Sequence, residues 1–490
     1  MPRVNIPIDG GFYESDSLPI SAQECVNWYV NIPQTEGALT TGSLFGCAGL
    51  NQIQTTGDSV KQVNRGMHVK AGLPYFLNGE TLIRVDRSFD IDGVETFTNV
   101  TIGTIPGDDR VSMADNGKEL MVLVPGGNGY IIDETSGTPF QQITSAGFTA
   151  NGAPQHVVFI DSFFVVTTDS KTFIRSSANQ GLVWSALDKF SAESDPDDIV
   201  APVVFKNKLY IAGSETIEEF QNIGGLFQRT GFFIAKGVFS AFSLIPTNDT
   251  FMFIGGGANE SPAVWALSGN TVQKVSTTAI DSVLQGFSDA QIKAAFSYSY
   301  AQKGAYFIGF SLPTITLEFN TITNKWNERK SRIINTKGLT ENIRWRANSI
   351  GTAYNRVLCG DSQDGRIGHV DIDTFSEYGS EIIRVMAIQP ISDLGNAIAI
   401  TQLEATFQSG VGDLTITNPQ VRLDISSNGV SFGDELSRSI GKIGEYNRRA
   451  IWYRLGRFPR FVVFRFTMSD PVKPSMIKLE LNMRGGQNGN

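Results

Sequence analysis

The stretch VVFIDSFFVVT, residues Val157–Thr167, indicates the fold class of the chain. It is rich in β-branched and aromatic residues around a polar turn, which is the composition of β-strands. Similar segments follow at Val203–Ile211 (VVFKNKLYI) and at Ala305–Phe310 (AYFIGF). Few segments have apolar residues at the helical spacing i, i+3, i+4 and i+7. The segment that fits this spacing best, Ala279–Ala294, is short. We therefore predict an all-β protein.

The strand segments recur at a nearly constant spacing. Successive strand centres lie 46, 44, 45, 43, 54 and 50 residues apart, at Tyr75, Met121, Val165, Tyr210, Phe253, Phe307 and Val357. A period of about 40–50 residues with several short strands in each unit is typical of propeller blades, which bury both apolar faces only by stacking around an axis. We predict a β-propeller of six or seven blades in residues 61–385. A pair of β-sandwiches with accidental spacing is the alternative.

The two ends of the chain follow other patterns. From about Ile391 the strands are longer and alternate more regularly, as in Gln420–Ser426 and Phe461–Met468. This predicts a separate C-terminal antiparallel β-sandwich or barrel-like layer in residues 386–490, although these strands could also close the last blade. Residues 1–60 show neither pattern and are expected to form an extended N-terminal arm that packs on another element or another subunit.

Composition and charge limit the classes of function. The 490 residues are 41% hydrophobic, which excludes a disordered chain, and carry a net charge of −9, which argues against a protein that grips nucleic acid over its whole surface. Residues 441–490 hold ten Lys and Arg against three Asp and Glu, so their net charge is +7 and −16 remains for the rest. The asymmetry predicts a basic surface that meets an acidic partner or nucleic acid, or arginines that pair with the acidic body of the same or a neighbouring chain.

The residues that catalysis needs are sparse. His68, His156 and His369 are the three histidines, and none lies near a serine or cysteine elbow. The sequence has no GxSxG, HExxH, paired CxxC or P-loop motif. The acidic residues at 193–198 and 361–373 lack EF-hand spacing and are expected to be solvated loops. We predict that the protein is not an enzyme and holds no cofactor or metal.

Other segments carry little targeting or redox information. The three cysteines are far apart, so no disulfide framework is implied. The first residues have no apolar signal region, and no run of 18 apolar residues occurs in the sequence, so we expect no secretion and no membrane insertion.

One motif supports a different function. Ser177-x-Asn179-x-Gly181-x-x-Trp184 matches the "Asp-box" hairpin of sialidase-type propellers, with Asn in the Asp position, and residues 426–432 form a shortened relative. The motif is structural: a polar side chain caps the turn, a glycine adopts positive φ, and the tryptophan packs beneath. It leaves open a glycan-binding or glycan-hydrolysing propeller on a virion or cell surface. A WD-type scaffold is a third possibility, disfavoured because no recurrent Gly-His or Trp-Asp dipeptides mark the blades.

The two ends resemble a known family. Cys25–Asn31 (CVNWYVN) and Leu44–Leu50 (LFGCAGL) are similar to the opening "VNxYxE… LYGTPGL" of short-tailed phage tail-hub, or packaged-DNA stabilisation, proteins, with Cys-Ala where the family tends to have Thr-Pro. Gly441–Arg457 (GKIGEYNRRAIWYRLGR), followed by Phe464–Phe466 and Ser469–Lys473, is similar to the closing pattern "GKxGEYxxRxxWxRLGxxRxxxFRxxxSDPVK". The middle resembles the family only in its blade strands, such as Tyr75–Gly79.

The resemblance implies a virion protein made in the host cytoplasm. Six copies would form the tail nozzle below the portal and its adaptor ring, with a propeller as the bulk of each subunit. Such hubs retain the packaged genome, carry tail fibres, spikes or a needle, and let double-stranded DNA pass through the lumen without sequence recognition. The basic block would face the adaptor or a neighbouring subunit, so the two ends supply the candidate interface residues Trp28, Tyr29, Lys442, Tyr446, Arg448, Arg449, Trp452, Arg454 and Arg457.

Overall fold

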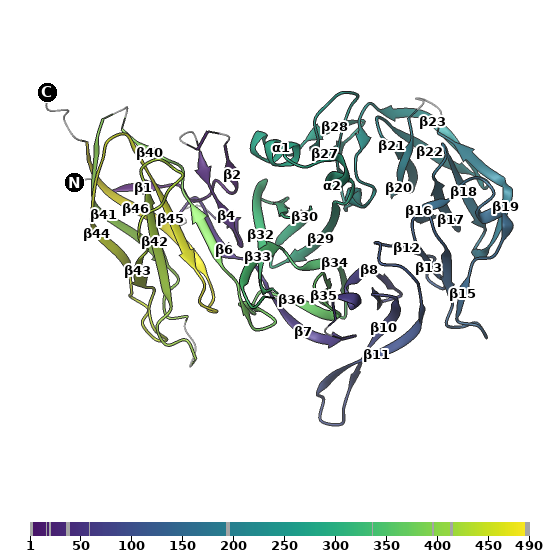
Figure 1. The fold of residues 1–490 in the computed structure, drawn as a ribbon, viewed down its shortest axis with the longest axis horizontal. Coiled ribbons are helices and arrows are strands. Elements are labelled where there is room, and N and C mark those ends of the chain that lie inside the picture. Colours follow the sequence, from purple (N-terminus) through teal and green to yellow (C-terminus); the bar gives the residue numbers. More distant parts are fainter. Residues whose placement is uncertain are drawn as a thin grey trace.

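The computed structural model shows a propeller and a sandwich side by side, both built almost wholly of β-strands, as predicted (Figure 1). Both chain ends lie at the sandwich. The structure describes residues 3–15, 17–18, 21–35, 40–57, 59–192, 197–335, 337–393, 396–411 and 415–485.

Seven sheets in the described part of the chain have the antiparallel four-strand order of propeller blades. Blade 1 consists of β8 (Asn64–Lys70), β9 (Leu73–Asn78), β10 (Thr81–Phe89) and β11 (Glu95–Thr104), and blade 2 consists of β12 (Ser112–Asp115), β13 (Leu120–Leu123), β14 (Gly129–Ile132) and β15 (Phe140–Gln142). Blade 3 consists of β16 (Pro154–Ile160), β17 (Phe163–Thr168), β18 (Thr172–Ser177) and β19 (Gln180–Ser191), and blade 4 consists of β20 (Ile199–Phe205), β21 (Lys208–Gly213), β22 (Ile217–Ile223) and β23 (Leu226–Ile234). Blade 5 consists of β24 (Gly237–Val238), β25 (Ile245–Pro246), β26 (Phe251–Gly256), β27 (Ala263–Ser268) and β28 (Thr271–Lys274). Blade 6 consists of β29 (Phe296–Gln302), β30 (Ala305–Ser311), β31 (Thr316–Asn320) and β32 (Lys325–Ile334), with β33 (Thr340–Arg344) beside β32. Blade 7 consists of β34 (Ala347–Ala353), β35 (Arg356–Asp361), β36 (Arg366–Asp371) and β7 (Gly49–Thr55).

The blades close into a ring through their inner strands. β8, β12, β16, β20, β25, β29 and β34 contact one another in this order, and β34 contacts β8. The described chain therefore has seven blades, the larger of the two predicted numbers. The outer strand of blade 7 is β7, which comes from the N-terminal segment and pairs antiparallel with β36.

Strand alternation explains how each blade packs on two neighbours. Tyr75 and Leu77 of β9 are fully buried and pack with Val122 of blade 2. Phe76, between them, points to the opposite face and packs with Leu358 of blade 7. Successive side chains of a strand alternate between faces, so a strand that is apolar throughout fits between two sheets.

Insertions explain the two longest steps of the repeat. The 54-residue step contains two helices between blades 5 and 6, α1 (Thr278–Gln285) and α2 (Asp289–Lys293), where one short helix was predicted. The 50-residue step contains β33, which pairs with β32 and extends blade 6. Neither α1 nor α2, nor any other described helix, is both long and apolar enough to cross a membrane.

The C-terminal strands form the predicted sandwich. One sheet has the order β44 (Ala450–Phe458), β41 (Ile398–Phe407), β46 (Ser475–Gly485), β6 (Ser43–Gly46) and β5 (Trp28–Asn31), with β1 (Val4–Ile6) also on β46. The other has the order β4 (Cys25–Val26), β39 (Arg384–Ala387), β45 (Phe461–Met468), β42 (Gln420–Ser426) and β43 (Leu436–Ser439), with β40 (Ile391–Ser392) on β45. Four short strands form two further antiparallel pairs: β37 (Ser376–Glu377) with β38 (Ser380–Glu381), and β2 (Tyr13–Glu14) with β3 (Ala22–Gln23).

The N-terminal segment is part of both bodies, which differs from the arm expected from the sequence. β5 and β6 continue one sheet of the sandwich, β4 pairs with β39 of the other, and β7 completes blade 7. β4 also pairs parallel with β32 of blade 6, so one sheet runs from the propeller into the sandwich. The segment lacks a blade period because its strands serve several sheets in turn.

Asn27 holds this junction together. It is buried and adopts positive φ (57°), which separates β4 from β5. Its side-chain Nδ2 donates to the carbonyls of Lys330 and Ile383, and its Oδ1 accepts from the Lys330 amide. Asparagine tolerates this backbone region and supplies both donors and an acceptor, so one residue connects blade 6 with the strand that enters the sandwich.

His156 makes the stability of the propeller depend on pH. It lies on β16, with its ring edge-on to Phe242 at 4.9 Å, and burial lowers its pKa from 6.5 to about 4. The unfolded chain therefore binds more protons than the folded chain between these pH values. The contribution of the neutral His156 ring to the free energy of unfolding is complete above about pH 6.5 and is lost as the pH falls toward 4. Between pH 7 and pH 4 we expect the free energy of unfolding of His156→Phe to fall by about 3 kcal/mol less than that of the wild type, as measured by urea unfolding at both pH values. Equal pH dependence in both proteins would contradict this assignment.

Candidate interaction surfaces

Three of the nine candidate interface residues are buried in the chain, and for Trp28 and Trp452 this corrects the sequence-based prediction. Trp28 and Tyr29 are 3% and 6% exposed, and Trp452 is fully buried. Trp452 donates from Nε1 to the Leu436 carbonyl and packs on Phe466 in the sandwich core. The size and apolar surface of Trp28 and Trp452 serve the cores, so a partner cannot reach these two without unfolding, whereas Tyr29 keeps a small exposed part in the wall of a cavity.

The other six candidates lie on an exposed surface of the sandwich, which we call the basic surface: Lys442, Tyr446, Arg448, Arg449, Arg454 and Arg457. Exposed apolar side chains lie among them, with Ile443 56%, Tyr446 74% and Tyr453 61% exposed. Mixed cationic and aromatic exposure of this kind is typical of residues that take part in protein interfaces.

A β-bulge on the edge strand β44 shapes the basic surface. Gln402 of β41 pairs with Tyr453 of β44, and Ile400 of β41 pairs with Gly456 of β44. Between these two pairs β44 therefore contains one residue more than β41. Arg454 has φ of 57° and Gly456 has φ of 111° at this point. The bulge breaks the alternation of the strand, and Tyr453 and Arg454 are consecutive exposed residues. Sequence alternation alone could not place them together.

Charge pairing leaves the basic surface largely unneutralised. Arg449 lies 3.2 Å from the buried carboxylate of Glu404, which also pairs with Arg3. Within the described part of the chain, Lys442, Arg448, Arg454 and Arg457 form no ion pair. Unpaired cations on a chain with a net charge of −9 mark this surface as one suited to an acidic partner.

Sequence reasoning missed a buried polar network at the junction. Arg329 is fully buried, with Nη1 3.6 Å from Glu318 Oε1 and Nη2 3.9 Å from Glu377 Oε1. It donates to the Tyr300 hydroxyl and to the Ala48 carbonyl. Burial raises the pKa of Glu377, which Arg329 opposes. The network joins blade 6, the β37 segment and the N-terminal segment, and charged residues in separate strands gave no signal of it in the sequence.

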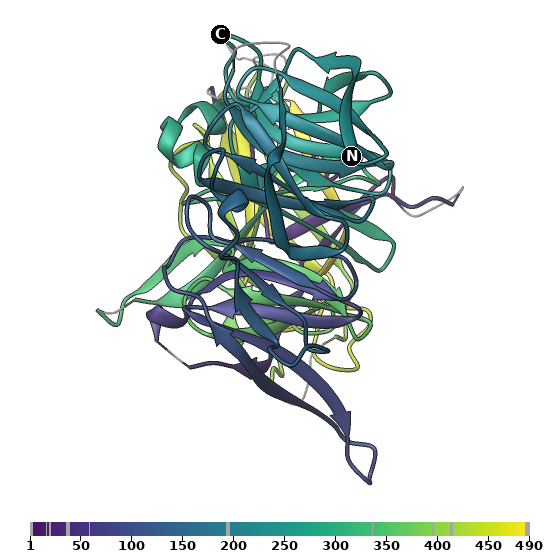
Figure 2. The ribbon, with the colours of Figure 1, turned by 90° about the vertical axis from the view of Figure 1, so that its right-hand side faces the viewer.

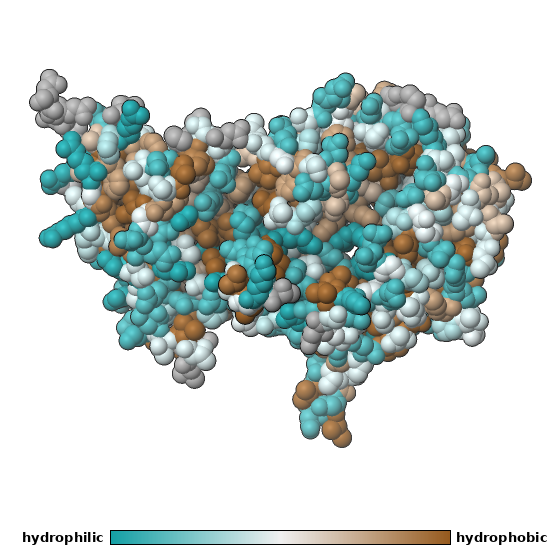
Figure 3. All heavy atoms as spheres, viewed as in Figure 1, coloured by the Kyte–Doolittle hydropathy of each residue, from teal (hydrophilic) through white to brown (hydrophobic). Residues whose placement is uncertain are grey.

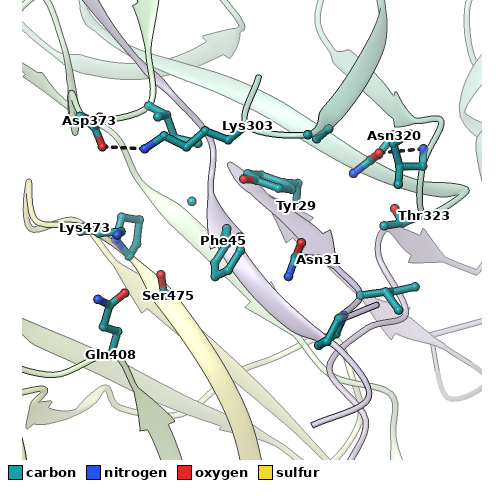
Figure 4. Close-up of a pocket in the computed structure, with 18 of the residues that line it drawn as sticks. Tyr29, Asn31, Phe45, Lys303, Asn320, Thr323, Asp373, Gln408, Lys473 and Ser475 are labelled. Atoms are coloured by element: carbon teal, nitrogen blue, oxygen red, sulfur yellow. Dashed lines mark hydrogen bonds and ion pairs between the residues drawn. The ribbon is translucent and has the colours of Figure 1, made fainter. Parts of the chain in front are cut away.

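A cavity of about 490 Å³ lies at the same junction and opens to solvent (Figure 4). Tyr29 and Phe45 form part of its wall, with ring centroids 6.0 Å apart. Figure 4 shows Lys303, paired with Asp373, on one side of the cavity and Lys473 on another. We call it the junction cavity; its lining comes from the N-terminal segment, three propeller turns, Gln408 and the segment that leads into β46.

A second cavity, of about 390 Å³, is lined by inner strands of the propeller. It contains His68, whose Nε2 lies 2.6 Å from Asp115, and the buried His156. The described residues that line it include one carboxylate and no arginine. A sialidase needs an arginine cluster, an acid and a nucleophile together, and this cavity does not bring them together.

The remaining sequence motifs are structural in the part that the structure describes. Trp184 packs on Phe148 and donates to the Gly181 carbonyl, as the Asp-box predicts. The positive φ of that turn falls on Asn179 rather than on Gly181, whose added Cβ would instead lie 2.5 Å from Ile131. Two of the acidic residues form ion pairs with arginines, Asp361 with Arg346 and Asp364 with Arg366. Residues 193–196 lie outside the described residues.

Comparison with known proteins agrees with the two bodies. Residues 4–375 match the family model "Bacteriophage P22 Gp10, beta-propeller", and residues 384–484 match "Bacteriophage P22 Gp10, beta-sandwich". Tail hub protein gp10 of Salmonella phage P22 is 21% identical over 397 residues, 78% of this chain and 82% of that protein.

Two solved structures resemble parts of the chain weakly. The N-terminal domain of Nup159 has a TM-score of 0.42 at 9% identity, covering 69% of this chain and 97% of its own. The computationally designed Ika8 protein has a TM-score of 0.38 at 12% identity, covering 66% of this chain and 99% of its own. The fold assignment therefore rests on the sheets and the family models.

The architecture is that of a propeller joined through its N-terminal segment to a β-sandwich that carries an exposed basic surface. The chain belongs to the bacteriophage P22 Gp10 family, whose two models together match residues 4–375 and 384–484. It is a non-enzymatic component of a phage virion, as the motifs at its two ends implied.

Proposed function

We propose that the chain is a subunit of the tail hub of a short-tailed phage. Copies of it, six by the resemblance, form a ring below the portal and its adaptor, retain the packaged genome and provide its exit conduit. The observation that carries the proposal is the family match over both bodies, together with the relative named as a tail hub protein. Tail fibres, spikes or a needle attach to this ring.

The charge distribution supports a conduit. Residues outside the basic C-terminal block carry a net charge of −16. An acidic lumen repels phosphate, so double-stranded DNA slides past without sequence recognition and without sticking. The basic surface then faces the adaptor or a neighbouring subunit rather than DNA.

The experiment that tests this function uses phage deprived of the chain. Particles assembled without it are expected to package DNA and then release it, because the exit below the portal is left open. Supplying the full chain to such particles restores DNA retention and adds a ring below the portal in electron micrographs. Particles that keep their genome without the chain would contradict the proposed function.

Reversing the charge of the basic surface tests its role. We expect Arg448→Glu, Arg454→Glu and Arg457→Glu together to reduce incorporation into virions about tenfold or more, because like charges then face an acidic partner. The subunit's stability should change little, since these side chains are exposed. Incorporation is measured by immunoblot of purified particles.

The matched control reverses three exposed propeller lysines, Lys61→Glu, Lys206→Glu and Lys337→Glu. It changes the net charge by the same amount at a different place. A control that loses as much incorporation as the basic-surface variant would show that total charge, not this surface, is responsible.

A further inference from the structure

The outer hairpin of blade 1 projects beyond the propeller. β10 pairs with β9 only from Thr81 to Arg84, whereas its pairing with β11 continues to Phe89 opposite Glu95. The last turn of the hairpin is therefore a two-stranded ribbon, and Figure 2 shows it standing clear of the body. We call residues 88–95 the hairpin tip.

The hairpin tip is held in one shape. Asp90 Oδ1 accepts from the backbone amides of Asp92 and Val94, and Gly93 adopts positive φ (78°). At its base, Glu95 pairs with Arg356 of blade 7. An isolated two-stranded hairpin is marginally stable in water, so these bonds are what keep the tip in place.

The hairpin tip exposes apolar side chains that its own chain leaves uncovered. Ile91 is 101% exposed, Phe89 60% and Val94 57%. Figure 3 shows the brown, hydrophobic residues at the end of the projection, far from any other part of the surface. Apolar side chains held rigidly at the end of a projection are characteristic of a contact site.

We propose that the hairpin tip of one copy inserts into the junction cavity of the neighbouring copy and that this contact closes the ring. The inference rests on the proposed function, since it names the surfaces that join subunits of the same ring. A projection and a hollow at different places on one chain make a head-to-tail contact, which generates a ring when the rotation closes.

The chemistry of the two surfaces is complementary. The tip carries Asp90 and Asp92 beside its apolar side chains, and the cavity has Lys473 and the Lys303–Asp373 ion pair around an apolar wall. Within the described residues Lys473 forms no ion pair, so it is available to an incoming carboxylate. The cavity volume of about 490 Å³ lies within the range of pockets that hold several apolar groups. The basic surface shares the charge and is built of a loop and the edge strand β44.

Cysteine cross-linking of the full chain tests the contact. All three native cysteines are buried, so engineered cysteines react alone. The variant Ile91→Cys with Ile322→Cys, which lines the junction cavity, is expected to form disulfides between copies and to give a ladder that ends at the closed ring. Ile91→Cys with Leu187→Cys, a residue 90% exposed on another blade, is the control and is expected to stay unlinked.

A third pair decides between the two receiving surfaces. Ile91→Cys with Tyr446→Cys tests the basic surface, and efficient linking of this pair in place of the cavity pair would overturn the proposal. A ring that forms with no link from position 91 would also overturn it while leaving the proposed function intact. A wild-type chain that forms no ring, alone or with portal and adaptor, would instead refute the proposed function itself.

A substitution gives an independent reading. Ile91→Asp is expected to weaken ring assembly about tenfold or more, because burial of the isoleucine is lost, while the unfolding midpoint of the subunit is unchanged. Leu187→Asp is the matched control. Equal assembly of wild type and Ile91→Asp, measured by sedimentation over a range of concentrations, would refute the contact.

Discussion

Replacing Arg329 with methionine is expected to lower the free energy of unfolding by about 3–5 kcal/mol, the largest loss we predict for one substitution. The guanidinium is the cation nearest to Glu318 and Glu377, which are 0% and 1% exposed, and its Cζ lies 3.9 Å from the Trp345 ring centroid. Without it, Glu318 loses its ion pair while it stays buried, and Glu377 keeps only the more distant Arg346 and Arg384. The loss is measured by urea unfolding of the full chain.

The pH dependence of this loss identifies its cause. A buried carboxylate without its cation has a raised pKa, so the folded variant binds more protons than the unfolded chain and gains stability as the pH falls. We therefore expect Arg329→Met to lose more stability at pH 8 than at pH 5. The control, Arg332→Met, breaks an exposed pair with Glu381 and should cost about 0–1 kcal/mol. Equal losses for the two variants would show that the buried network does not hold the junction.

Replacing Leu44 with alanine is expected to lower the free energy of unfolding by about 2–5 kcal/mol, because it leaves a cavity in the largest core. Leu44 is fully buried on β6, where it pairs with Val30 of β5 and Met476 of β46. Thermal and urea unfolding of the subunit measure the effect.

The control for Leu44 lies in the same N-terminal segment. Ile32 is 40% exposed, and Ile32→Ala should cost less than about 1 kcal/mol. The pair of variants separates two descriptions of this segment. If Leu44→Ala left subunit stability unchanged and lowered only ring assembly, the segment would act as an intersubunit arm rather than as part of the core.

The propeller could be predicted from the sequence because its strands are local. Each blade is a meander of consecutive strands, so the apolar segments recur with the blade period, as Tyr75, Met121 and Val165 show. The blade number stayed open because α1, α2 and β33 stretch the last steps. The Asp-box turn was predicted in place, although its positive φ lies on Asn179.

The N-terminal segment was beyond prediction for a physical reason. Its strands pair with partners more than 300 residues away, such as Cys25 with Met386 and Leu50 with Val370. Nothing in a local pattern distinguishes a strand that completes a distant sheet from an extended arm. The same limitation placed Trp28 at an interface, since large aromatic side chains suit a partner and a core equally well.

The basic surface was predicted in part because charge is a property of the sequence. Lys442, Arg448, Arg454 and Arg457 lie in one short basic block, and they are exposed in the structure. Trp452 lies in the same block and is buried, as strand alternation requires. The hairpin tip and the junction cavity gave no sequence signal, because the first depends on where β9 stops pairing and the second on residues from seven separate segments.

The central claim is that copies of this propeller and sandwich form a closed ring that carries DNA out of the virion. Native mass spectrometry of the full chain, alone and mixed with its portal and adaptor, tests that claim most directly. We predict a single closed species with a fixed number of copies, six by the family resemblance, that forms without intermediates at high concentration. A chain that remains monomeric under all of these conditions, or grows into open polymers of unlimited size, would contradict it.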